Sequence, residues 1–111
     1  MLGSNIELSS ATSSRIILDS TGTGGRKYTM ASGGNGSLDF YDYDASAYRM
    51  RIDSSGNLLV GTTLGDVGLW YNRKGVVAKE NGQLHAAVYG GAAAVLNRNT
   101  NDGDIVQFRK A

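Results

Sequence analysis

The sequence predicts an all-β fold that completes its hydrophobic core by assembling with other chains. Short segments rich in β-branched and aromatic residues, several alternating apolar with polar side chains, are separated by glycine-containing turns. The 111 residues include 16 Gly and no Pro, and the 41% that are hydrophobic count many alanines. A domain of this size gains little by burying so few large side chains alone. With no Cys and one His, disulfide or metal stapling is not expected, so assembly remains.

Nine strands are expected along the chain. They cover residues 14–20, 26–32, 37–43, 48–53, 57–63, 75–80, 83–89, 93–99 and 104–110. The turns "STGTGG", "GGNG", "SSG", "ENG" and "NDG" supply the positive φ angles of tight hairpins. Residues 85–97 contain enough alanine for a helix, but Gly90 and Gly91 interrupt them and no capping residues frame them, so strand is favoured.

Several strand-turn-strand units resemble one another. Their separations are unequal, so the chain is not a solenoid with a fixed repeat. Two interpretations stay open: ordinary β turns that look alike, or an elongated sheet-and-turn rod whose units each bury an apolar edge against other chains. The glycines that align between the units are Gly22, Gly56, Gly82 and Gly103.

The clearest unit is "YRMRIDSSGNLLVGTT", residues 48–63. Strand alternation predicts one apolar edge and one charged edge before the turn, and Leu58 to Val60 then resume the burial. The apolar edge is expected to consist of Tyr48, Met50 and Ile52, and the charged edge of Arg49, Arg51 and Asp53.

Charge and hydropathy exclude several classes of partner. Eleven Lys and Arg against ten Asp and Glu give a net charge of +1, and the signs are interspersed, so no nucleic-acid partner is expected. No apolar run approaches the ~20 residues of a membrane span, and the N-terminus lacks the pattern of a signal peptide. Residues 1–4, with their Gly-Ser pair, are expected to be a tag remnant, and residues 5–111 form a single domain.

Two stretches invite a chemical interpretation that their spacing does not support. "TGTGGRKYT" (21–29) is glycine-rich, but Lys27 is followed by Tyr28 and a strand, whereas a phosphate-binding loop needs Ser or Thr and a helix. Asp39, Asp42 and Asp44 cluster as cation ligands do, yet on a strand Asp39 points away from the other two. Solvated turns and strand faces are the simpler interpretation of both.

No catalytic residue, metal site or cofactor is expected. His85 is the only imidazole, and no nucleophile elbow or oxyanion loop singles out a serine to work with it. One His without Cys does not furnish the usual zinc ligands. The chain is therefore predicted not to be an enzyme, and His85 to be an ordinary strand residue near the surface.

The best candidate for recognition is "VGLWYNRKG", residues 67–75. Aromatic faces beside amide and guanidinium donors suit the stacking and hydrogen bonding of a carbohydrate. The alternative is that one aromatic faces the core and the basic pair keeps the turn soluble. The candidate ligand-binding residues are Trp70, Tyr71, Arg73 and Lys74.

Two segments resemble bacteriophage tail fibres and tailspikes. "AYRMRIDSSGNLLVGTT" (47–63) is similar to a segment that recurs in these proteins as Arg-Met-Arg-Ile-Asp followed by a Ser-Gly-Asn turn and a glycine-rich strand. "LNRNTNDGDIVQFRK" (96–110) looks like the stretch that leads toward the self-cleaving C-terminal chaperone domain, as in polysialic-acid-degrading tailspikes. Together they cover about a third of the chain.

This resemblance implies an elongated homotrimeric fibre segment with an intertwined triple β-helix and short β-sheet parts. Its function would be that of a structural stalk in the virion, outside the cell, which contributes to host attachment and carries surface polysaccharide-binding sites. The chain ends before the chaperone domain, so it is expected to be a truncated stalk without self-cleavage. A stand-alone carbohydrate-binding module is the alternative, and a glycan-degrading domain is the least supported.

Overall fold

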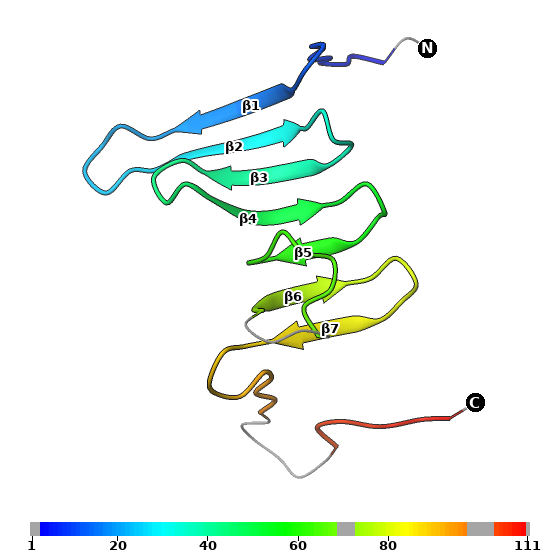
Figure 1. The fold of residues 1–111 in the computed structure, drawn as a ribbon. Helices are drawn as coiled ribbons and strands as arrows, with labels where there is room; N and C mark the ends of the chain where they lie inside the picture. The colour runs from blue at the N-terminus through cyan, green and yellow to red at the C-terminus, as the bar shows by residue number, and fades with distance from the viewer. Residues whose placement is uncertain (1–2, 69–72, 98–103, 111) are drawn as a thin grey trace.

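The chain folds into one open antiparallel sheet of seven strands. A computed structural model describes residues 3–68, 73–97 and 104–110. The strands pair strictly in sequence order, so that the sheet is a simple meander from β1 to β7 (Figure 1). They are β1 (Ser14–Asp19), β2 (Lys27–Ser32), β3 (Leu38–Asp42), β4 (Ala47–Ile52), β5 (Leu58–Val60), β6 (Gly75–Ala78) and β7 (Leu84–Ala87). The predicted all-β class is thereby confirmed.

The first seven predicted strands are confirmed, with ends that differ by a few residues. The last two predictions are wrong for the part of them that the structure describes: residues 93–97 and 104–110 form no strand. These segments follow the last strand of the meander and lie beyond the sheet, where no neighbour supplies a hydrogen-bonding ladder (Figure 1). No helix forms over residues 85–97, and within the described ranges no helix could cross a membrane.

Three five-residue turns of the same kind connect β2 to β3, β4 to β5 and β6 to β7. In each, the first residue donates its N–H to the carbonyl of the fifth, and the fourth residue is a glycine that donates to the carbonyl of the first. Each glycine has a positive φ, between 77° and 87°, a backbone conformation that is unfavourable for residues with a side chain. The turns are Gly33–Ser37, Asp53–Asn57 and Lys79–Gln83, and they lie along one side of the sheet (Figure 1).

The predicted alignment of turns is correct for Gly56 and Gly82 and wrong for Gly22. Gly22 lies in the longer loop between β1 and β2, where its carbonyl accepts a hydrogen bond from Gly25. The third equivalent glycine is Gly36, while Gly103 lies outside the described residues. The physical reason is that a glycine next to small polar residues can serve several turn positions, so its letter alone does not fix its place.

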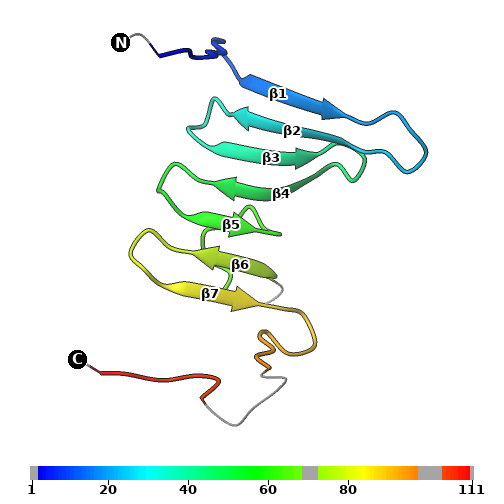
Figure 2. The same cartoon turned by 180° about the vertical axis from the view of Figure 1, so that it is seen from behind.

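One face of the sheet is apolar and has no other segment over it. We call the apolar face the side formed by two rows of directly paired residues. The first row is Ile16, Met30, Phe40, Met50, Val60, Val76 and Ala86, and the second is Ser14, Ser32, Leu38, Ile52, Leu58, Ala78 and Leu84. Seen from behind, no chain crosses this side (Figure 2). Ile16, Val60 and Val76 remain 42–44% exposed.

The opposite side, the polar face, carries the small core of the chain. Leu59 and Val77 project from β5 and β6, and Val67 from the long β5–β6 loop covers them (Figure 1). These three are the buried hydrophobic side chains of the described residues, and Ala87 packs beside them. The core therefore covers only β5 to β7 and leaves the rest of the polar face without a buried apolar cluster among the described residues.

The chain is far from compact. Its Cα radius of gyration is 18.4 Å, against about 13 Å for a compact domain of this length. Its accessible surface is 9042 Å², whereas a compact monomer of this mass exposes about 5,900 Å². A single sheet buries its apolar face only by packing it against a second layer, and the described residues provide no such layer.

Candidate functional site

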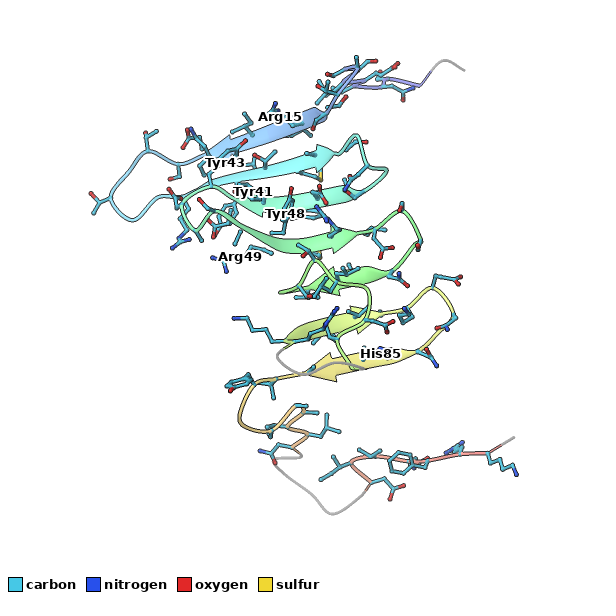
Figure 3. The ribbon with its side chains drawn as sticks, viewed as in Figure 1. Arg15, Tyr41, Tyr43, Tyr48, Arg49 and His85 are labelled. Atoms are coloured by element: carbon cyan, nitrogen blue, oxygen red, sulfur yellow. The ribbon has the colours of Figure 1, made fainter. Side chains whose placement is uncertain are left out.

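An open pocket lies on the polar face over β1 to β4. Its volume is about 530 Å³, and its lining includes the side chains Arg15, Thr29, Asp39, Tyr41 and Tyr48. Except for Tyr43, which follows β3, the labelled pocket residues come from the strands and lie on the side turned toward the viewer (Figure 3). The β5–β6 loop, whose Val67 covers the core, does not line this pocket. Pockets of this size are typical of sites for small ligands.

A β-bulge between β3 and β4 puts Tyr48 into the pocket. Phe40 pairs with Met50, but the next residue, Tyr41, pairs with Tyr48, so that Arg49 is left as the extra residue. Extra residues re-aim the side chains that follow them. The prediction that Tyr48 shares an apolar edge with Met50 is wrong for this reason: Met50 lies on the apolar face and Tyr48 on the polar face.

The β3–β4 turn holds Tyr43 at the pocket rim. The Tyr43 carbonyl accepts a hydrogen bond from Ser46 N–H at 3.2 Å, and Ser46 closes the turn with a φ of 49°. Tyr43 N–H donates to the carbonyl of Lys27 at 3.0 Å, which ties the turn to β2. These backbone hydrogen bonds therefore fix the position from which the Tyr43 side chain projects.

The three tyrosine rings form one aromatic cluster. Tyr41 lies in the middle, with ring centroids 5.2 Å from Tyr43 and 5.0 Å from Tyr48, and both pairs meet edge to face. The Arg51 guanidinium lies 4.2 Å from the centroid of the Tyr48 ring. Such contacts hold rings in place beyond what burial alone does, so the cluster is a preformed surface.

The charges around the pocket leave an excess of one cation. Asp39 is bound by Arg51 through both carboxylate oxygens, at 2.5 Å and 3.2 Å. Arg15 forms no ion pair within the described ranges, and its Nη1 donates a single long hydrogen bond, 3.4 Å, to the Tyr43 hydroxyl. Most of the donors on Arg15 therefore remain available in the pocket.

Thr29 supplies a polar group without a partner. Its side chain is 95% buried, and Oγ1 makes no hydrogen bond of acceptable geometry among the described residues. The Thr29 hydroxyl is nevertheless near enough to Tyr43 to be the main cause of a lowered Tyr43 pKa, followed by Arg15. Oγ1 is itself covered from solvent, so the group that faces it is the nearby Tyr43 hydroxyl and not a ligand.

The three clustered aspartates do not form a cation site. Asp42 accepts hydrogen bonds from Arg26 at 2.8 Å and from Arg49 at 2.7 Å and 3.0 Å. Asp39 lies on the other face, paired with Arg51, and Asp44 accepts from the backbone N–H of Lys27 at 2.9 Å. As the sequence predicts, Asp39 and Asp42 point apart. No group of three metal-ligating side chains occurs in the described part of the chain.

His85 lies on β7 beneath the β5–β6 loop. Its Nδ1 is 3.6 Å from Asp66 Oδ1 and has no hydrogen-bond partner among the residues that the structure describes. Its side chain is 22% exposed, and Asp66 also faces Lys79 at 3.8 Å. The arrangement is that of a strand residue packed under a loop, in line with the sequence-based expectation.

The structure describes two of the four residues that the sequence predicts to bind carbohydrate. Trp70 and Tyr71 lie outside the described residues. Arg73 and Lys74 line, with Tyr48 and Thr62, a second pocket of about 410 Å³ at the side of the sheet. Arg73 Nη1 donates to the Asp66 carbonyl at 3.2 Å, which ties it to the loop that covers the core.

Sequence reasoning missed the tyrosine pocket. The signal was present in "FYDYDASAYR": Tyr41 and Tyr43 are two residues apart, as strand neighbours on one face are, and Tyr48 follows the turn. The bulge that aligns Tyr48 with Tyr41 has no glycine or other letter that announces it. Arg15 belongs to β1 and Thr29 to β2. Only the register of the strand pairs shows that both share a face with Tyr41 on β3.

Comparison with known proteins finds no matching family model, no matching curated protein and no matching solved structure.

Proposed function

We propose that the chain is a stalk segment of a homotrimeric bacteriophage tail fibre or tailspike, located in the virion and contributing to host attachment. The observation that carries this proposal is the apolar face, which spans all seven strands and has no partner within the described chain. A surface of this extent marks an interaction site in a soluble protein. Three copies that turn their apolar faces toward a common axis bury all three at once.

The exposed area has the size that a permanent assembly requires. The chain exposes 9042 Å², which exceeds the about 5,900 Å² of a compact monomer by about 3,100 Å². Obligate interfaces bury 2,000 Å² or more in total. Apolar surface removed from water stabilises the assembly by ~25 cal/mol per Å², so burial of the apolar part of this excess favours assembly.

The segments that flank the sheet support intertwining. Residues 88–97 and 104–110 carry exposed apolar side chains and pair with no strand of their own chain. Val95 and Phe108 are 82% and 96% exposed. In the proposed fibre these segments wrap around their counterparts as an intertwined triple β-helix, while each sheet pairs its strands within one chain. Such wrapping also covers the open edge of β7.

The arrangement of the carboxylates favours a structural role over a catalytic one. Asp39 and Asp42 lie on opposite faces of the sheet, and arginines occupy their oxygens. Glycoside hydrolysis needs two free carboxyl groups that flank one bond. We therefore propose no enzymatic activity and no cofactor for the described residues.

A second candidate function is a carbohydrate-binding module that acts without a fibre. The tyrosine pocket favours it, because aromatic rings beside a cation suit a sugar whether or not the chain assembles. The two functions differ in what the apolar face does.

A pair of neighbouring residues tests the fibre proposal. Ile16 and Ile17 are adjacent on β1 and similarly exposed, at 43% and 50%, but Ile16 belongs to the apolar face and Ile17 to the polar face. We expect Ile16→Glu to dissociate the trimer by at least tenfold in the concentration of half-dissociation, because it buries a carboxylate between chains. Ile17→Glu, the matched control, should leave assembly unchanged. Equal effects of the two variants, measured by sedimentation equilibrium, would exclude the apolar face as the interface.

A further inference from the structure

The polar face of the sheet has the features of a recognition site, whereas the opposite, apolar face has those of an interface between chains. The pocket of about 530 Å³ over β1 to β4 is rimmed by the Gly33–Ser37 turn on one side and the β3–β4 turn on the other. Assembly through the apolar face would leave it open to solvent, because the two faces point in opposite directions.

The floor of this pocket combines apolar and polar recognition. Tyr41 and Tyr48 offer aromatic surface that the edge-to-face cluster holds in place. The Arg15 guanidinium and the Tyr43 hydroxyl add polar groups to the same pocket. A ring whose C–H groups contact an aromatic surface while its hydroxyls need partners is a sugar.

The charge of the pocket selects among sugars. Asp39 is neutralised by Arg51, and Arg15 has no carboxylate partner within the described ranges. A guanidinium in this state presents a fork of donors that matches a carboxylate in two parallel hydrogen bonds. The pocket therefore has one uncompensated positive charge beside its aromatic floor.

We propose that this pocket binds an acidic sugar residue of a surface polysaccharide, with the sugar carboxylate on Arg15 and the ring against Tyr41 and Tyr48. This inference rests on the proposed role in host attachment and names the ligand class for it. Three copies in a fibre present three such pockets, so that millimolar binding at each becomes effective on a polymer.

Two oligosaccharides test the ligand class. The acidic probe is a tetrasaccharide of alternating glucuronic acid and N-acetylglucosamine, and the neutral probe is maltotetraose. We expect the acidic probe to shift the NMR signals of the Arg15 side-chain N–H and the Tyr41 and Tyr48 rings with saturation, and the neutral probe to bind at least tenfold more weakly. Equal affinities, or shifts confined to other residues, would overturn the proposal.

Three variants separate a site from general charge attraction. Arg15→Gln should weaken binding of the acidic probe at least tenfold. Arg109→Gln removes the same charge from an exposed arginine that, among the described residues, donates hydrogen bonds only to the nearby Gln107, and it should leave the affinity unchanged. Thr29→Val keeps the side-chain volume, and we expect it to leave the affinity unchanged, because Oγ1 is covered from solvent. Equal losses in Arg15→Gln and Arg109→Gln would overturn the proposal.

The mass of the chain, measured in the same samples, keeps the two proposals distinguishable. A trimer that does not bind the acidic probe contradicts the pocket proposal and leaves the fibre standing. A monomer that binds it contradicts the fibre and supports the pocket.

Discussion

At the scale of single residues, buried charge pairs set the pH range in which the sheet is stable. Asp42 is buried, and hydrogen bonds from the Arg49 guanidinium are the main reason why its pKa lies below the ordinary value, although burial opposes them. Asp53 behaves alike: burial raises its pKa, but the hydrogen bonds from Asn57 and Ser55 together outweigh it. Both carboxylates are therefore more stable as anions in the folded chain than in the unfolded one.

This gives a prediction for acid. The unfolded carboxyl of Asp42 binds its proton near pH ~4, whereas the folded one binds it at a lower pH. Between these values the unfolded chain holds more protons, so the free energy of unfolding falls as the pH drops below ~4. We expect Asp42→Asn to be less stable at pH 7 and to lose less stability between pH 5 and pH 3 than the parent chain. Thermal melts across this range measure both slopes, and parallel slopes would contradict the assignment.

The Tyr48 side chain shows where residue-level prediction from the sequence stops. Alternation along "YRMRI" places Met50 and Ile52 correctly on one face and Arg51 on the other. It fails at Tyr48 because one unpaired residue, Arg49, shifts the phase by one, and no residue type is diagnostic of such a bulge. The same shift builds the tyrosine pocket, so the missed side chain and the missed site have one cause.

At the scale of elements, the three five-residue turns hold the sheet in register. They pack against one another: Glu80 N–H donates to Asn57 Oδ1 at 3.1 Å, which links the last two turns. Asp53 in turn accepts from the N–H groups of Ser55 and Asn57 and from the Asn57 amide. Register fixes which face each side chain takes, so these turns determine that the apolar rows line up.

A glycine pair tests this role of the turns. Gly56 has a φ of +85°, and a Cβ there would also approach Glu80 Cβ to 3.4 Å. We expect Gly56→Ala to lower the free energy of unfolding by about 1–2 kcal/mol, because a side chain disfavours this conformation. Gly22→Ala is the control: its φ lies outside the left-handed region and no atom would lie within 4 Å of the new Cβ, so it should change stability by less than about 0.5 kcal/mol. Urea unfolding measures both, and equal losses would show that Gly22 is a turn glycine of the same kind.

Strands and turns can be predicted from the sequence where they depend on local residues. The prediction fails where a strand needs a neighbouring strand. Residues 27–32 and 38–42 are typical strand segments joined by a glycine turn, so both their existence and their pairing are predictable. Residues 104–110 also contain β-branched and aromatic side chains, but a strand also needs a ladder partner, and the described residues offer none beside them. Their apolar side chains are consistent with a partner outside the chain.

At the scale of the molecule, the described chain is a single layer whose two faces differ. Its small core of Leu59, Val67 and Val77 covers part of the polar face, while the apolar face spans the whole meander uncovered. A lone sheet with such a face is an aggregation hazard as a monomer. The lack of Cys and the small number of large apolar residues predict a need for partners, but which face is left uncovered comes only from the register.

The mass of the purified chain in solution tests the central claim most directly. Sedimentation equilibrium over a hundredfold range of concentration should give about 35 kDa, three times the 11.7 kDa of one chain, because closed symmetric assemblies have a defined number of subunits. A chain of 11.7 kDa that is monomeric at every concentration and still unfolds cooperatively would contradict the proposal that the apolar face exists to bring three copies together.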